Sequence, residues 1–65
     1  MNRTIRLVFE RETPGAVLYQ EVDLNGKRLT NDADGALVRT LYLRKKQLNG
    51  KIPQILAITI VEAVQ

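Results

Sequence analysis

The chain carries few of the side chains that enzymes use as nucleophiles and bases. It contains no His, Cys or Ser, which excludes the Ser–His–Asp and Cys–His arrangements of nucleophilic catalysis. Two carboxylate pairs, Glu21 with Asp23 and Asp32 with Asp34, have a spacing of two residues, which on a strand places both members on one face. Acid–base catalysis also needs a cleft, for which 65 residues leave little room. We therefore expect no enzymatic activity and interpret these carboxylates as solvated.

Metal and cofactor chemistry has as little support in the sequence. Without Cys and His, thiolate and imidazole ligands are missing. Residues 31–35, NDADG, resemble part of a calcium-binding loop, but the register puts Thr30 at the first ligand position and Leu41 at that of the bidentate Glu. Asp32 and Asp34 instead suit a turn whose side chains accept hydrogen bonds from nearby amides. We expect no metal ion and no cofactor.

Basic and aromatic side chains offer more specific chemistry. Tyr42 and Arg44 share a face of one predicted strand, and Tyr19 lies on another. A sheet binds single-stranded nucleic acid by stacking bases on exposed aromatic rings while Lys and Arg follow the phosphates. The candidate nucleic-acid-binding residues are Arg6, Tyr19, Tyr42, Arg44, Lys45, Lys46 and Lys51. In the alternative interpretation, both tyrosines pack inside a barrel or dimer and the basic run is a solvated turn.

Charge is distributed unevenly along the chain. The net charge is +3, but residues 1–34 carry five basic and six acidic side chains, whereas residues 35–65 carry five basic and one acidic. A basic half is typical of a surface for nucleic acid or another acidic partner, and it also occurs as a solvated face that keeps a small protein in solution.

Alternating hydrophobicity predicts strands over residues 3–10, 16–24, 36–44 and 55–64. Pro14-Gly15 predicts the turn of a first hairpin. Asn25-Gly26 predicts a type I′ turn, in which both central residues have positive φ, leading into a short edge strand over residues 27–30. Residues 45–48 are compatible with a single helical turn.

The strand faces are not clearly divided into apolar and polar sides. In the first strand Ile5, Leu7 and Phe9 form the core face. In the second strand we assign Leu18, Gln20, Val22 and Leu24 to the core face, and Val17, Tyr19, Glu21 and Asp23 to the outer face. In the third strand Leu37, Arg39, Leu41 and Leu43 share one face, opposite Val38, Thr40, Tyr42 and Arg44. The last strand is apolar on both faces, with Leu56, Ile58 and Ile60 on one and Ile55, Ala57, Thr59 and Val61 on the other.

These features predict a single all-β domain over residues 1–65, a small antiparallel sheet of four or five strands. Because a chain of this size cannot easily cover both faces of an open sheet, the sheet must curl into a barrel or pack against a second copy. We expect a homodimer, the commonest symmetric assembly. Its predicted interface consists of Val38, Thr40, Tyr42, Ile55 and Val61.

No apolar run reaches the roughly 18 residues of a membrane span. The N-terminal stretch is charged throughout and lacks the apolar core of a signal peptide. We expect a cytoplasmic protein that does not associate with membranes.

The order of several short motifs resembles that of a group of short bacterial and phage-type β-proteins with an ETP…Y…TLYLRK…P…ITI layout. The motifs are Glu10-Arg11-Glu12-Thr13, Tyr19, Thr40–Lys45, a Pro-containing break and Ile58–Ile60. The resemblance covers most of the chain, apart from the NDADG loop and the KKQLNGK connector. It implies an all-β fold and no particular activity.

The function that these observations favour is a non-catalytic, homo-oligomeric β-module that binds a macromolecule, most specifically single-stranded DNA or RNA. The alternative is a protein-interaction or structural module, which would use either an exposed sheet edge to recruit a partner strand or the face that carries Tyr19 and Tyr42.

Overall fold

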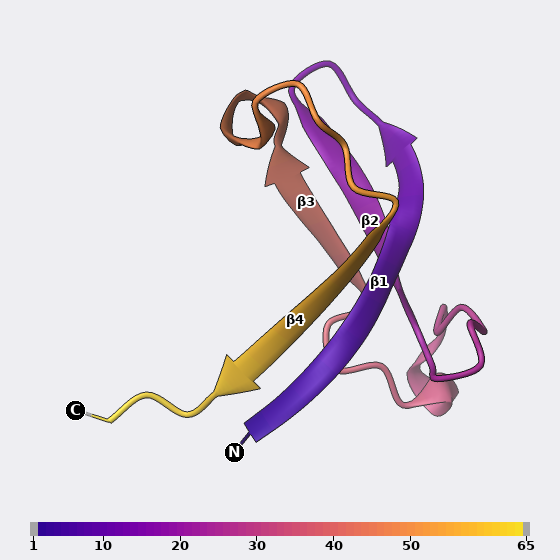
Figure 1. Ribbon diagram of the computed structural model, residues 1–65. Helices are drawn as coiled ribbons and strands as arrows, with labels where there is room; N and C mark the ends of the chain where they lie inside the picture. The colour runs from indigo at the N-terminus through magenta and orange to yellow at the C-terminus, as the bar shows by residue number, and fades with distance from the viewer. Residues whose placement is uncertain (1, 65) are drawn as a thin grey trace.

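A computed structural model describes residues 2–64, which form one antiparallel sheet of four strands. The strands are β1 (Asn2–Glu12), β2 (Ala16–Val22), β3 (Thr40–Arg44) and β4 (Ile55–Val61), with two short 3₁₀ helices, η1 (Asp32–Asp34) and η2 (Lys45–Leu48). The strand order is β3-β2-β1-β4 (Figure 1). The predicted all-β class is confirmed.

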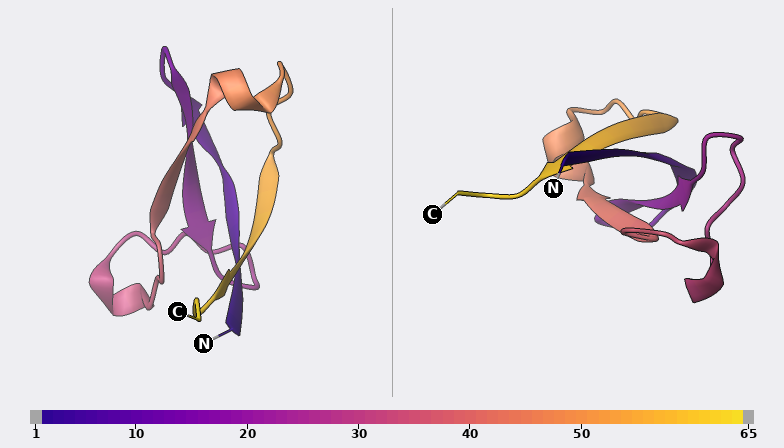
Figure 2. Two further views of the ribbon diagram at one scale, coloured as in Figure 1. Left: turned by 90° about the vertical axis from the view of Figure 1, so that its left-hand side faces the viewer. Right: turned by 90° about the horizontal axis from the view of Figure 1, so that it is seen from below.

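The sheet curls into a half-barrel that opens between its two edge strands. Viewed into the open side, β3 and β4 form two rims with β1 and β2 behind them, and the connector that contains η2 crosses one end (Figure 2). Among the described residues, no helix has the length and apolar character needed to cross a membrane.

The core lies on the concave face. Ile5, Leu7, Val17 and Tyr19 are its buried centre, and the partly buried residues around them come from β1, β3, β4, the loop before β3 and the connector. These are Phe9, Val38, Leu41, Leu43, Leu48, Ile52, Leu56, Ile58 and Ile60. The predicted inward face of β1 is confirmed, and in β4, which is apolar on both sides, the face of Leu56, Ile58 and Ile60 is the one that packs inward.

The predicted face of β2 is wrong. Val17, Tyr19 and Glu21 point into the half-barrel, since Val17 and Tyr19 pair with the inward-facing Leu43 and Leu41. The Tyr19 hydroxyl donates a 2.8 Å hydrogen bond to the Pro53 carbonyl, so the ring is buried without leaving its polar atom unpaired.

On the convex side of β2, the residues assigned to the core have other environments. Leu24 lies beyond the strand and is 89% exposed. Gln20 is buried because its amide donates hydrogen bonds to the carbonyls of Glu21, Leu29 and Arg39. A returning segment that contains Leu29 therefore covers this part of the outer face.

The segment after β2 differs from the predicted hairpin. Asn25 does not have positive φ, and only Gly26 adopts the left-handed conformation, so the turn is not type I′. The Asp23 carboxylate organises it instead by accepting hydrogen bonds from the amides of Asn25 and Lys27. The predicted edge strand over residues 27–30 is reduced to a single bridge that pairs Arg28 with Val22.

The NDADG loop behaves as the predicted turn. The Asp34 carboxylate accepts hydrogen bonds from the amides of Thr30 and Asn31, and the Asn31 side chain caps η1. The Asp32 side chain lies outside the described part of the structure. The helical turn predicted for residues 45–48 is confirmed as η2.

The third predicted strand begins four residues later than expected, at Thr40. Arg39 has a left-handed backbone, φ 70°, which interrupts the extended conformation. Val38 packs against the core, whereas the sequence placed it on the second face. The last strand ends at Val61, three residues before its predicted end.

Candidate nucleic-acid interface

The convex face of β3 presents an exposed aromatic ring beside basic side chains. Tyr42 is 56% exposed, and Arg44 follows it on the same face of the strand. Across the sheet, Tyr42 pairs with Leu18 of β2, which pairs in turn with Arg11 of β1. Because residues directly opposite each other share a face, Tyr42, Leu18 and Arg11 form one row on the convex surface.

A β-bulge brings Arg11 into this row. Strict alternation would place Arg11 on the same face as Phe9, towards the core. The register shifts between Phe9 and Arg11, so that Phe9 pairs with the inward-facing Tyr19 while Arg11 pairs with Leu18. Arg11 is therefore a candidate binding residue that was not predicted, and no Gly or Pro marks the bulge in the sequence.

The connector adds further positive charge at the same end of the sheet. Lys45 lies 3.0 Å from Glu12 in an ion pair, which neutralises it in part. Lys46 and Lys51 are exposed. Within residues 2–64, no carboxylate forms an ion pair with Arg11, Arg44, Lys46 or Lys51. Arg11, Arg44 and the Tyr42 ring on the convex side, together with Lys46 and Lys51 in the connector at the same end of the sheet, are here called the basic face.

Two predicted binding residues do not belong to the basic face. Tyr19 is fully buried, and burial raises the pKa of its hydroxyl, so its ring is not available to stack with a base. Arg6 is exposed on the convex side, but it pairs with Val22 and Ala57, far along β1 from Arg11. The prediction that Tyr19 shares a surface with Arg6 and Tyr42 is wrong, because Tyr19 lies on the inward face of β2, whereas Arg6 and Tyr42 lie apart from each other on the convex side.

The predicted dimer interface is also divided by the fold. Thr40 and Tyr42 lie on β3 and Ile55 and Val61 on β4, at opposite edges of the sheet. Val38 packs against the core. The five residues therefore do not form one continuous surface.

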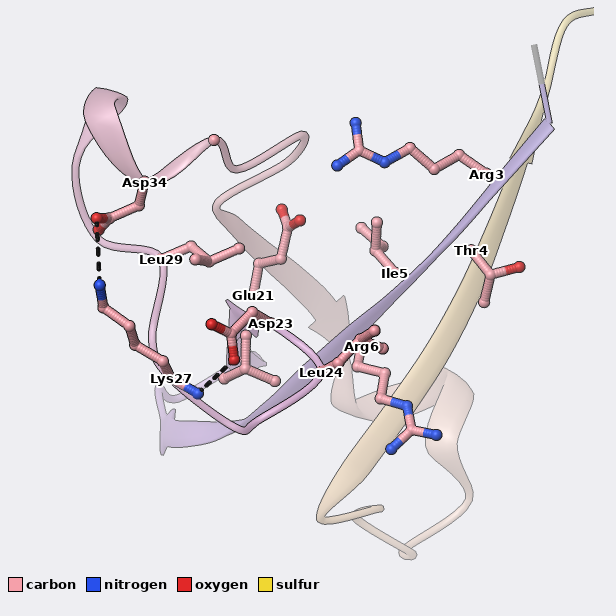
Figure 3. Close-up of a pocket in the computed structure, with 12 residues that line it drawn as sticks. Arg3, Thr4, Ile5, Arg6, Glu21, Asp23, Leu24, Lys27, Leu29 and Asp34 are labelled. Carbon is pink, nitrogen blue, oxygen red and sulfur yellow. Dashed lines mark hydrogen bonds and ion pairs between the residues drawn. The ribbon is translucent and has the colours of Figure 1, made fainter.

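A hollow of about 480 Å³ lies between the start of β1 and the loops that follow β2, away from the basic face. Figure 3 shows Arg3 extending towards its opening, Ile5 and Glu21 inside, and the Lys27–Asp34 ion pair at its rim. The carboxylates of this hollow are already engaged by backbone amides or by Lys27.

The Glu21 carboxylate holds the loop that leads into β3. Although Glu21 is only 2% exposed, Oε1 accepts hydrogen bonds from the amides of Val38 (2.7 Å) and Arg39 (2.9 Å), and Oε2 accepts one from Leu37 (3.2 Å). Burial by itself raises the pKa of Glu21, but these three N–H donors and the charge of Arg3 together lower it below its usual range. Glu21 is therefore a buried anion with a structural role in positioning β3.

Within residues 2–64 no group of three or more carboxylates, His or Cys has an arrangement that would hold a metal ion. Comparison with protein-family models, curated proteins and solved structures finds no match for this chain. The chemistry of the basic face is thus the main guide to function.

Proposed function

We propose that this protein binds single-stranded nucleic acid on the basic face. The observation that carries the proposal is the half-exposed Tyr42 ring, which lies in one row with Arg11 and beside Arg44, neither of which has an acidic partner in the described chain. An unpaired base stacks on such a ring, and the flanking guanidinium groups contact the phosphates on either side. A single aromatic ring limits the site to a few nucleotides.

Electrostatics supports the same surface. Residues 35–61 contain five basic side chains and no acidic one, and most of them lie in β3 and the connector. For single strands, each phosphate contact lowers the slope of log K against log salt by about 0.7. Four cations therefore correspond to a slope of about −3. Binding is expected to be strong only at low ionic strength.

The proposal is tested by fluorescence anisotropy of labelled single-stranded DNA and RNA over a series of salt concentrations. The double variant Arg44→Gln/Lys46→Gln should weaken binding and reduce the magnitude of the slope by about 1.4. The matched control, Lys27→Gln/Arg28→Gln, removes the same net charge from the loop after β2 and should leave the slope nearly unchanged. No binding to either oligonucleotide at low salt, or equal losses in the two double variants, would overturn the proposal.

A further inference from the structure

The outer edge of β4 presents unpaired backbone groups. β4 is the last strand of the sheet and pairs only with β1. The Phe9 amide donates a 2.9 Å hydrogen bond to the Gln54 carbonyl, and hydrogen-bonded pairs alternate along an antiparallel ladder. In the observed register Ile5 pairs with Ile58. The backbone N–H and C=O groups of the even-numbered residues of β4 therefore form hydrogen bonds with β1. The odd-numbered residues direct N–H and C=O groups away from the sheet.

This edge lacks the features by which proteins protect an unpaired strand. Residues 55–61, ILAITIV, contain no charge, Pro or Gly, and their register against β1 is continuous. The opposite edge, β3, is different: it has five residues, carries Arg44, and its Thr40 amide already bonds to the Val38 carbonyl. β4 is therefore the edge available for strand addition.

The dimensions of the chain indicate that a large surface is left uncovered. It exposes 5059 Å², whereas a compact protein of 7.4 kDa exposes about 4,200 Å². Its radius of gyration is 12.7 Å, against about 11 Å for a compact domain of this length. Part of the excess comes from the segment after β4, where Val64 is 98% exposed. The whole excess is about 850 Å², and the share that the tail does not explain is available to an interface, to which one partner contributes about 800 Å² in a standard complex.

The pattern of exposed residues on β4 is symmetric about Ile58. Ile55 and Val61, 66% and 61% exposed, lie three residues before and after it. We infer that β4 pairs with β4 of a second copy, antiparallel and across a two-fold axis at Ile58. This register places Ile55 opposite Val61 of the second copy and Ala57 opposite Thr59. It uses every outward-facing N–H and C=O of the strand and joins the two half-barrels into one eight-stranded sheet.

Neighbouring registers are less favourable. Moving the axis to Ala57 brings Pro53, which has no N–H, opposite Val61. Moving it to Thr59 leaves Ile55 without a partner in the opposing strand. The axis at Ile58 also leaves the basic face free, since Tyr42 lies on the far rim of each half-barrel.

The inference is tested first by light scattering, which should give twice the 7.4 kDa mass of one chain. The variant Ala57→Pro removes an outward N–H and leaves the bonds to β1, so it should produce a monomer with an unchanged circular dichroism spectrum. Ala57→Thr keeps that N–H and should remain dimeric. A wild-type monomer over the whole accessible concentration range, or a dimer that Ala57→Pro does not dissociate, overturns the inference.

Single cysteines then determine the register, because the chain has no native Cys. On the axis, Cα atoms of the two copies at position 58 are about 4.5 Å apart, within disulfide range. At position 60 they are separated by four residues along the strands, about 13 Å. Ile58→Cys should therefore form a covalent dimer on oxidation. Ile60→Cys, which replaces the same residue type on the same face, should not. Cross-linking of both variants to the same extent contradicts the register.

Discussion

The variant Glu21→Gln should destabilise the domain by about 2–4 kcal/mol. The amide has nearly the shape of the carboxylate but only one acceptor oxygen. If that oxygen keeps the Val38 and Arg39 amides, the new NH₂ group faces the Leu37 amide, which now has no acceptor. An unsatisfied buried donor costs about 1–3 kcal/mol, and the remaining bonds lose the strengthening that a charged acceptor provides.

Urea denaturation followed by circular dichroism measures this loss. The control is Glu10→Gln, an exposed carboxylate paired with Arg28, for which the expected change is at most about 1 kcal/mol. Amide hydrogen exchange should also speed up at residues 37–39 in the Glu21 variant. Equal midpoints for Glu21→Gln and wild type, with unchanged exchange in this loop, would refute the structural role of Glu21.

Glu21 also makes the stability of the domain depend on pH, and the sign of this dependence follows from the direction of its pKa shift. Because the pKa of Glu21 is lower in the folded than in the unfolded chain, the folded state binds fewer protons. The contribution of Glu21 is therefore fully present above its unfolded pKa of about 4.3 and is lost as the pH falls through the folded pKa. The difference in stability between wild type and Glu21→Gln should shrink over that acidic range. A difference that stays constant to the lowest measurable pH would contradict this assignment.

Two further substitutions probe the core and the basic face. Tyr19→Phe deletes the hydrogen bond to the Pro53 carbonyl and should lower the free energy of unfolding by about 1 kcal/mol in the same urea assay, and an increase in stability would contradict the bond. Arg11→Gln should weaken binding of single-stranded DNA and reduce the magnitude of the salt slope by about 0.7, while Arg6→Gln leaves the slope unchanged. A reduced slope for Arg6→Gln together with an unchanged slope for Arg11→Gln would place the nucleic acid elsewhere on the sheet.

The inward face of a strand followed from sequence where one face was clearly apolar. Ile5 and Leu7 alternate with polar residues, and this assigned β1 and its inward face correctly. In β4 the alternate residues Leu56, Ile58 and Ile60 were correctly grouped on one face, but both faces of this strand are apolar and the sequence did not show which of them is inward. Short-range hydrophobic periodicity is sufficient for β1 because burial of its apolar side decides the register.

The face of β2 was not predictable in this way. Each of its faces carries apolar residues and one polar side chain, Glu21 on one and Gln20 on the other. The choice depends on partners distant in sequence, since Glu21 is satisfied by amides 16 to 18 residues away and Gln20 by carbonyls of Leu29 and Arg39. Periodicity within a strand contains no information about those partners.

The candidate site was predicted in part. Tyr42, Arg44 and Lys46 were identified from their residue types and lie together on or beside β3. Tyr19 was included because its face was assigned incorrectly. Arg11 was missed because the predicted strand ended at residue 10, whereas β1 continues to Glu12 through a bulge that forms by pairing with β2 and that local sequence does not reveal.

The most direct test of the proposed function compares Tyr42→Ala with Tyr42→Phe in anisotropy titrations of single-stranded DNA and RNA at low salt. A stacked base contributes about 1–3 kcal/mol, so loss of the ring should weaken binding about 5- to 150-fold. Phe keeps the ring and should bind within a few-fold of wild type. If the Ala and Phe variants bind as tightly as wild type, Tyr42 is not a stacking platform and the proposed function is wrong.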